Sequence, residues 1–272
     1  MANVLIPLDG SAPAEAVIPV VASLQPAQVS FLHVREDLEA PAAAEAMFAS
    51  ARRRAALPDE QVRTLVRPGR PADAILAAAQ EVGATLIALS SHGRTGFNRF
   101  VLGSVAEEVI RAAPTPVLLI RAGTPAPDQP VLHRPLVGYD GSEKAWRAVE
   151  ALALIGCGRA GPTDLLGVLD VAPLRPGQAT DDLIERLIAQ QRDELLQRVQ
   201  QAAERARHLG LDATAVVREG RPSTVLLDAA EQNGNTAIVV ATHGRSVLTR
   251  WIFGSVAEEL LHTSPIPLLV AR

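Results

Sequence analysis

The sequence has few cysteines, lysines and aromatic residues, and each shortage excludes a class of function. Cys157 is the only cysteine among 272 residues, so neither an internal disulfide nor a cysteine-built metal site can form. The only lysine, Lys144, precedes an alanine, which excludes the pattern GxxxxGK[ST] and its phosphate-binding loop. Aromatic residues make up 3% and the formal net charge is −4, so a nucleic-acid surface built on stacking and positive charge is not expected.

Long apolar runs are also missing. No stretch approaches the roughly 18 apolar residues of a membrane-spanning helix. The opening run MANVLIPLDG contains no basic residue and reaches Asp9 too early for a secretory signal peptide. We therefore expect a cytoplasmic protein that neither spans a membrane nor binds nucleic acid.

The chain repeats itself over almost its whole length. HGRTGFNRFVLGSVAEE, residues 92–108, returns as HGRSVLTRWIFGSVAEE, residues 243–259, with ten of seventeen positions identical. Further repeated motifs are Asp-Gly-Ser at 9–11 and 140–142, Gly-Arg-Pro at 69–71 and 220–222, and single arginines at 121 and 272. The segment 122–134 is rich in proline, which suits an extended linker. We predict tandem domains at residues 1–121 and 135–272.

Each half alternates short aliphatic runs with helical segments. In the first half the predicted strands are 3–9, 29–34, 62–66, 84–90 and 116–121, and the predicted helices are 11–25, 42–57, 71–82 and 104–113. The unbroken apolarity of the runs is typical of parallel strands buried on both faces. The second half gains a long helix at about 182–208, whose apolar stripe comprises Leu183, Leu187, Leu195, Val199, Ala202, Ala206 and Leu209. This alternation predicts two tandem, doubly wound α/β domains with open parallel sheets.

Two loops in each half are candidates for a ligand site. In doubly wound sheets, ligands bind beyond the carboxyl ends of the strands, where the strand order reverses. Asp9 and Asp140 end the first strand of each half, and His-Gly-Arg at 92–94 and 243–245 follows the fourth. If the first and fourth strands are neighbours, these loops meet in one crevice. Asp-Gly-Ser is equally consistent with a simple turn in which the aspartate caps the next helix.

The motif Gly-Ser-Val-Ala-Glu-Glu also has two interpretations. Ser104 precedes Glu107 by three residues, as in an S-x-x-E capping box. Capping does not explain Gly103, nor Gly93 ten residues earlier. Glycines before a helix let its free amides approach an anion, and Arg94 would add positive charge. We predict a phosphate-binding loop, repeated in the second half at Gly244, Arg245, Gly254 and Ser255.

These residues resemble a known family. SSHGRTGFNRFVLGSVAEEVIRAAPTPVLLIR resembles the C-terminal signature of the universal stress proteins, and VLIPLDGS and LVGYDGS resemble their first strand. The resemblance covers both halves and implies the strand order 3-2-1-4-5, with five strands in each. It also implies an ATP site with the motif G-x2-G-x9-G-[ST], in which Ser90 and Ala241 here replace the first glycine.

The resemblance further implies which residues would contact ATP, with Mg2+ as the accompanying ion. In the first half these are Pro7, Leu8, Asp9, Val34, Leu89, Ser90, His92, Gly93, Arg94, Gly103, Ser104 and Val105. In the second half they are Gly138, Tyr139, Asp140, Val171, Val240, Ala241, His243, Gly244, Arg245, Gly254, Ser255 and Val256. Single-domain members pair through the last strand, so the resemblance implies an intramolecular pseudo-dimer of the two halves, and a homodimer is a further possibility.

Three functions stay open. The first is a nucleotide-binding stress sensor or scaffold whose state follows ATP. The second is an ATP-independent interaction protein of the same fold, favoured if the side chains of Ser90 and Ala241 obstruct the phosphates. The third is a slow ATP hydrolase. His92 and His243 would be its candidate catalysts, but the sequence identifies neither a nucleophile nor an orienting carboxylate beside them, so we assign no catalytic residue.

Overall fold

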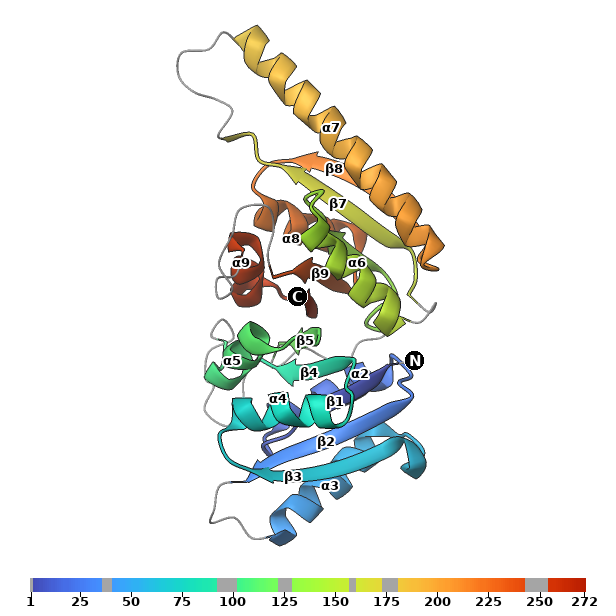
Figure 1. Cartoon of the computed structure of the whole chain (residues 1–272), viewed down its shortest axis with the longest axis vertical. Helices are drawn as coiled ribbons and strands as arrows, with labels where there is room; N and C mark the ends of the chain where they lie inside the picture. The colour runs from blue at the N-terminus through green and yellow to red at the C-terminus, as the bar shows by residue number, and fades with distance from the viewer. Residues whose placement is uncertain are drawn as a thin grey trace.

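The computed structural model describes residues 2–35, 41–91, 102–121, 129–156, 160–172, 181–242 and 254–272. Figure 1 shows an elongated molecule, with the chain up to residue 121 (the first half) at one end and the chain from residue 135 (the second half) at the other. The predictions for Cys157 and for the two His-Gly-Arg motifs concern residues outside the described part of the chain.

The described strands form one continuous ten-stranded sheet. In the first half they are β1 (Asn3–Pro7), β2 (Gln28–Arg35), β3 (Val62–Pro68), β4 (Leu86–Ser90) and β5 (Val117–Ile120). In the second half they are β6 (Pro135–Gly138), β7 (Thr163–Leu169), β8 (Ala213–Glu219), β9 (Ala237–Ala241) and β10 (Leu268–Ala271). The spatial order is β3-β2-β1-β4-β5-β10-β9-β6-β7-β8. Within each half the neighbouring strands are parallel, which confirms the predicted α/β fold class.

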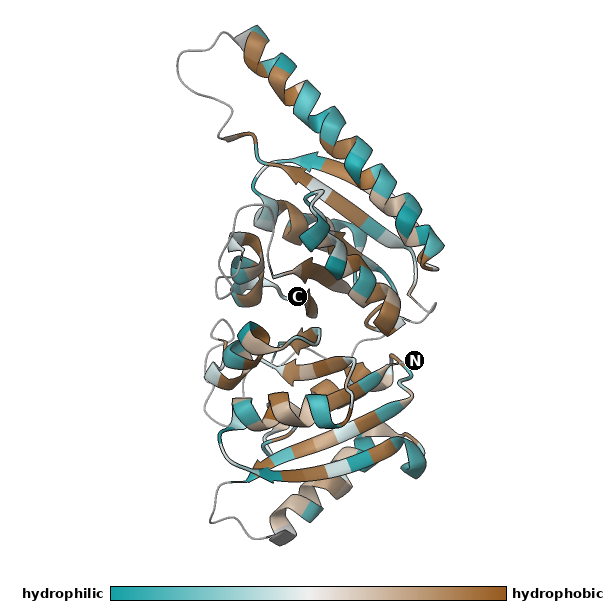
Figure 2. Ribbon diagram, viewed as in Figure 1, coloured by the Kyte–Doolittle hydropathy of each residue, from teal (hydrophilic) through white to brown (hydrophobic). Residues whose placement is uncertain are grey.

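Helices cover both faces of this sheet. On one face lie α1 (Ala12–Glu15), α2 (Val17–Ala22), α3 (Pro41–Ala55), α6 (Glu143–Gly156) and α7 (Asp181–His208). On the other lie α4 (Pro71–Glu81), α5 (Ser104–Ala112), α8 (Pro222–Asn233) and α9 (Ser255–Thr263). A 3-10 turn at Asp59–Gln61 precedes β3. Adjacent strand residues are buried in opposite cores, Val4 in one and Leu5 in the other. This explains the unbroken apolar runs of central strands such as β9, which is brown in Figure 2. Burial on both faces does not hold for the edge strand β3, in which only Val62 is buried and which is mixed in colour.

The helix expected over 11–25 is shorter and interrupted. It consists of α1 and α2, which meet at Ala16, and the segment ends with Gln25 in the left-handed region at φ 49°. Pro19 explains the break, because proline has no N–H to donate to the Glu15 carbonyl and its ring crowds that oxygen. The other predicted helices begin and end within two residues of their expected positions.

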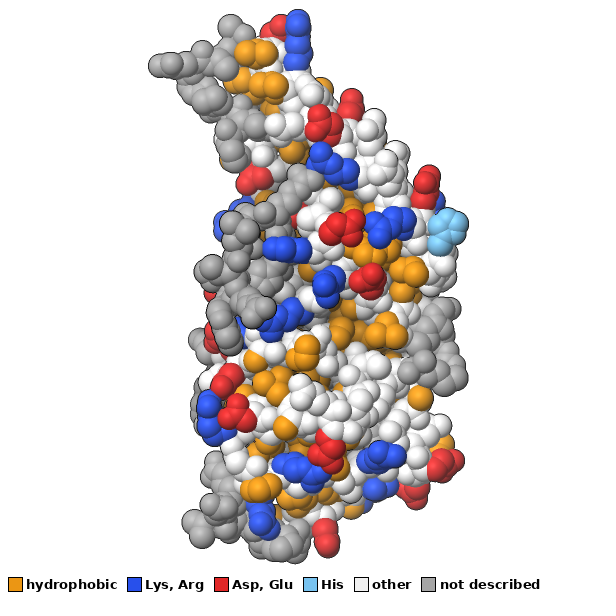
Figure 3. Space-filling model, in the orientation of Figure 1, with side chains coloured by type: hydrophobic (Ala, Val, Ile, Leu, Met, Phe, Trp, Pro, Cys, Tyr) orange, Lys and Arg blue, Asp and Glu red, His pale blue; other side chains and the backbone are white. Residues whose placement is uncertain are grey.

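The long helix α7 is present, but only part of its predicted stripe is buried. Leu195 and Val199 pack on β7 and are 6% and 0% exposed, whereas Leu183 and Leu187 are 51% and 41% exposed. The N-terminal part of α7 extends past the sheet, and hydrophobic atoms are visible there (Figures 1 and 3). The stripe prediction is therefore wrong for this end of the helix, and also for Leu209, which follows α7 and is exposed. Within the described residues, no helix has both the length and the apolarity needed to cross a membrane.

The two halves meet through their last strands. β5 and β10 pair antiparallel, with Leu119 opposite Leu268 and Leu118 opposite Leu269. Pairing these two strands covers edges that would otherwise be open to other strands. The described end of the linker also packs between the halves. Val131 is buried there, and its amide donates a hydrogen bond of 3.2 Å to Ser23 Oγ at the end of α2.

Candidate ligand site

A cavity of about 420 Å³ lies at the carboxyl ends of β6, β7 and β9 in the second half. The position matches the switch point of a doubly wound sheet, because β6 is flanked by β7 on one side and β9 on the other. Its walls come from these strands and from α6, α8 and α9. The described residues that line it are Gly138, Tyr139, Asp140, Ala145, Leu166, Val168, Asp170, Pro222, Leu226, Val240, Ala241, Gly254, Ser255, Val256 and Ala257.

Eight of the sequence-predicted residues line this cavity. They are Gly138, Tyr139, Asp140, Val240, Ala241, Gly254, Ser255 and Val256. Val171 does not: it lies beyond the end of β7, and the strand instead contributes Val168. Comparison of the two halves shows why Val168, not Val171, corresponds to Val34. The Leu8 amide donates a hydrogen bond to Leu32 O, and the Tyr139 amide donates the equivalent hydrogen bond to Leu166 O. Val34 and Val168 each lie two residues after the bonded leucine and are therefore the equivalent positions.

The first wall is the Asp-Gly-Ser turn that follows β6. Asp140 Oδ1 accepts a hydrogen bond of 3.0 Å from the Ser142 amide, and Ser142 Oγ accepts one of 3.0 Å from the Ala145 amide at the start of α6. Gly141 between them has φ 79°, a conformation that a residue with a Cβ rarely adopts. The aspartate thus shapes the turn and borders the cavity. The interpretation in which it caps the next helix is wrong, because the capping side chain is the serine, Ser142 here and Ser11 at α1 in the first half.

The first half repeats this turn. Asp9 Oδ1 accepts a hydrogen bond of 2.9 Å from the Ser11 amide, and Ser11 Oγ accepts one of 3.3 Å from the Ala14 amide. Buried His33 on β2 supports the same edge of the sheet, with its Nδ1 2.9 Å from the oxygen of Leu8. Because a carbonyl oxygen only accepts, Nδ1 carries the proton in this bond.

The second wall is the N-terminus of α9, and here the capping-box prediction is wrong. The residue that caps α9 is Gly254, which has no side-chain cap, and Ser255 is the first helical residue. α5 begins in the same way at Gly103 and Ser104. The first amides of a helix have no partner within the helix. Within the described residues, the amides of Ser255 and Val256 donate to no acceptor, and these two residues border the cavity.

The second glutamate of the repeated motif has a structural role instead. Arg221 Nη2 lies 2.9 Å from Glu259 Oε2, and Arg70 Nη2 lies 2.7 Å from Glu108 Oε1 in the first half. Each arginine is the middle residue of a Gly-Arg-Pro motif, and the next residue in the second half, Pro222, lines the cavity. These ion pairs link the start of α8 to the middle of α9, and the start of α4 to the middle of α5. They give a structural role to both the Gly-Arg-Pro motif and the second glutamate.

The replaced motif glycines are Ser90 and Ala241, at the ends of β4 and β9. Neither has a positive φ, so a side chain causes no backbone strain at either position. Ala241 borders the cavity. The Ser90 hydroxyl is shielded from solvent and has no hydrogen-bond partner among the described residues. The other first-half candidates within the described residues lie at the same edge of the sheet, at the ends of β1, β2 and β4 and at the start of α5.

Sequence reasoning missed several of the walls. Val168 and Asp170 were missed because the second half has an insertion, which shifts the apparent equivalence of the strand ends. Leu166 and Leu226 carry no motif and were found only from the structure. The repeated Gly-Arg-Pro motif was the signal that could have indicated Pro222.

These features define a doubly wound α/β protein with a cavity at the switch point of its sheet. The chain belongs to the universal stress protein family: the family model matches residues 1–121 and again 132–272. A universal stress protein of Mycobacterium tuberculosis is 31% identical over 201 residues, which are 70% of this chain and 62% of that protein. The match therefore spans less than two thirds of the mycobacterial relative. A universal stress protein of Bacillus subtilis is 25% identical over 148 residues, 52% of this chain and 100% of that protein.

Solved structures share the fold over the whole chain. A universal stress protein from Archaeoglobus fulgidus superposes with a TM-score of 0.66 at 19% identity, covering 99% of this chain and 98% of that one. A functionally unknown protein from Pseudomonas aeruginosa superposes with a TM-score of 0.69 at 17% identity, covering 100% and 92%. At these identities the likeness concerns the fold alone.

Proposed function

We propose that this tandem universal stress protein is an ATP-binding sensor or scaffold of the stress response. The observation that carries the proposal is the cavity of the second half, with a carboxylate turn at Asp140 on one side and the N-terminal amides of α9 on the other. We place the domains at residues 1–121 and 135–272. The pairing of β5 with β10 supports the further proposal that they act as an intramolecular pseudo-dimer.

The cavity suits an adenine nucleotide in size and chemistry. Its volume of about 420 Å³ lies within the range of small-molecule sites, roughly 300–1,000 Å³. Leu166, Leu226 and Val240 offer an apolar surface for a flat base. Asp140 and Asp170 offer oxygens that accept hydrogen bonds from ribose hydroxyls.

The α9 N-terminus suits the phosphates, because its amides and the helix dipole favour negative charge. The described lining residues include two carboxylates but no lysine or arginine. A triphosphate would therefore need another countercharge. We propose Mg2+ and Arg245 for this role, and the corresponding proposal for the first half involves Arg94.

Calorimetry with Mg-ATP on nucleotide-free protein tests this function. We expect a dissociation constant between millimolar and micromolar, which corresponds to a binding free energy of roughly −4 to −8 kcal/mol. Binding should weaken when EDTA removes the metal. Each amide contact to a charged phosphate is worth about 1.5–3 kcal/mol. The double variant Gly103→Val with Gly254→Val should therefore bind at least about tenfold more weakly.

A second variant separates ligand loss from fold loss. Gly254 has φ −63° and ψ 141°, so an aspartate at this position can cap α9 without strain. Gly254→Asp should keep or slightly raise the unfolding midpoint, while its carboxylate repels phosphate and removes binding in the second half. No heat from nucleotide-free wild type, or equal affinity in a Gly103→Asp/Gly254→Asp variant, would overturn the ATP proposal.

One observation favours the second function, an ATP-independent interaction protein. The N-terminal part of α7 exposes Leu183 and Leu187 by 51% and 41%, more than a covering helix needs. If calorimetry shows no nucleotide binding, this end of α7 is the first surface to test by substitution with glutamine.

A further inference from the structure

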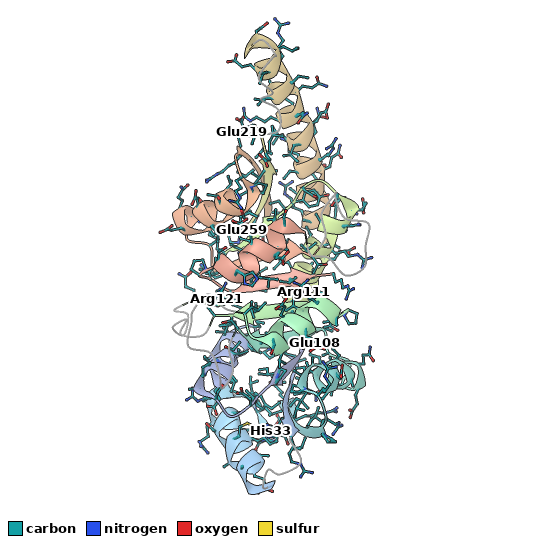
Figure 4. All side chains as sticks on the ribbon, turned by 90° about the vertical axis from the view of Figure 1, so that its left-hand side faces the viewer. His33, Glu108, Arg111, Arg121, Glu219 and Glu259 are labelled. Atoms are coloured by element: carbon teal, nitrogen blue, oxygen red, sulfur yellow. The ribbon has the colours of Figure 1, made fainter. Side chains whose placement is uncertain are left out.

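The last residue of each repeat reaches into the other half. Arg121 follows β5, and its guanidinium donates two hydrogen bonds across the junction: Nε to Ser264 O at 2.9 Å and Nη2 to Leu261 O at 2.7 Å. Both acceptors belong to the last turn and cap of α9. Figure 4 places Arg121 at the junction between the halves. Burial lowers the pKa of Arg121 below its ordinary value, as expected for a guanidinium partly removed from water.

The second half makes the reciprocal contact. Arg272, which follows β10, donates from Nη1 to Arg111 O at 3.0 Å, in the last turn of α5. The Arg111 side chain adds to the junction, with Glu107 Oε1 at 2.9 Å in its own helix and Glu258 Oε1 at 3.5 Å in α9. We call Arg121 and Arg272 the crossed arginines, since each contacts the C-terminus of a helix in the opposite half.

These helix ends need an outside donor. The last carbonyls of a helix have no partner within it, and a left-handed glycine commonly provides the local solution, as Gly234 does after α8 with φ 64°. α5 and α9 end differently. Their caps, Ala113 and Ser264, are extended at ψ 126° and 123°, and a proline follows each. The crossed arginines supply donors that the local sequence does not.

The same two helices begin at the proposed phosphate ends of the ligand sites. α5 and α9 are short helices of nine residues, roughly 13 Å long. A contact that fixes the C-terminus of so short a helix also fixes the position of its N-terminal amides. Ligand binding by close backbone approach is sensitive to that position.

We propose that the crossed arginines are positioning residues for the ligand sites, each holding the ligand-binding helix of the opposite half. Arg121 acts on the site at Gly254, and Arg272 acts on the site at Gly103. This inference rests on the proposed function, because it concerns affinity at the same sites. It makes the affinity of each site depend on an arginine of the other half.

Variants with one site each provide the test. Gly103→Asp leaves only the second-half site and Gly254→Asp only the first-half site, and Mg-ATP affinity is measured by calorimetry in both. In the Gly103→Asp protein, Arg121→Ala should weaken binding about fivefold and Arg272→Ala less than twofold. In the Gly254→Asp protein, Arg272→Ala should weaken binding about fivefold and Arg121→Ala less than twofold.

Two further measurements separate positioning from general destabilisation. Arg121→Lys keeps the charge but has one donor group in place of a fork, so it should recover only part of the lost affinity. Hydrogen exchange should quicken in α9 for Arg121→Ala and in α5 for Arg272→Ala. If wild type binds no nucleotide, the proposed function fails and this inference with it. If wild type binds but each arginine affects its own half, or both sites equally, only the inference is overturned.

Discussion

Gly167 in β7 offers a sharp test of how α7 packs on the sheet. A Cβ at this position would lie 2.8 Å from Val199 Cγ2 and 3.2 Å from Leu195 Cγ. Both neighbours are buried, and a β-branched valine has little rotamer freedom to move aside. Gly167→Ala should therefore push α7 away from β7. The first half has His33 at the equivalent position, where the shorter helix α3 covers the sheet.

Two effects oppose each other in this variant. Alanine in place of a strand glycine gains about 0.5–1 kcal/mol, because the unfolded chain loses freedom. Overpacking a full core costs about 1–3 kcal/mol. Since 2.8 Å is closer than carbon atoms approach without a shift, the steric effect prevails. We expect the free energy of unfolding to fall by about 1–2 kcal/mol.

Urea unfolding followed by circular dichroism measures this loss, and a double-mutant cycle assigns it. Val199→Ala alone should lower the free energy of unfolding by about 1.6 kcal/mol, because it removes two buried methyl groups. It also frees the space that Gly167→Ala needs, so the double variant should lose about 1 kcal/mol less than the sum. Val4→Ala is the matched control, because Val4 is a buried valine of the first half. Its effect should add to that of Gly167→Ala. A Gly167→Ala protein as stable as wild type, or an additive Val199 pair, would refute this account of the packing.

Two further predictions concern charge and strand pairing. The hydrogen bond from Arg67 lowers the pKa of Glu81 in the folded protein. The stabilisation from this pair is therefore complete above the ordinary glutamate pKa and is lost as the pH falls through the lowered pKa. In an NMR titration of the Glu81 carboxyl, the midpoint pH should be higher in Arg67→Gln than in wild type. An unchanged midpoint would contradict the role of Arg67 in lowering this pKa. Leu119→Pro or Leu269→Pro removes a backbone donor from a central strand and should split unfolding into two transitions. Leu→Ala at the same sites keeps the donor and should retain one transition; identical behaviour would show that backbone pairing does not couple the halves.

The sheet and its helices were largely predictable from sequence, because burial on both faces imposes unbroken apolar runs and the repeat supplies two independent copies of the same pattern. Errors arose where one residue changes local hydrogen bonding. Pro19 interrupts the first helix. Ser104 lies one position inside α5, so a sequence that fits the capping box forms none.

The candidate site was predictable only where it coincides with a repeated motif. Asp140 and Gly254 were found in this way. Leu226 is one apolar residue among many in α8, and only the tertiary structure brings it to the cavity. Arg121 was visible as a repeated residue, but its acceptors lie about 140 residues away in sequence, at Leu261 and Ser264. No local pattern specifies a contact of that range.

The antiparallel pairing of β5 with β10 has a consequence for how the two candidate sites can diverge. Identical subunits related by a two-fold axis must present every residue twice, so any change in one site is a change in both. One polypeptide with two halves escapes this constraint, and its pairing does not weaken on dilution, because the linker keeps the partners together. The equivalent residues at the strand ends already differ: Pro7 and Leu8 in the first half correspond to Gly138 and Tyr139 in the second. The tandem chain can therefore carry two sites with different ligand preferences on one symmetric framework.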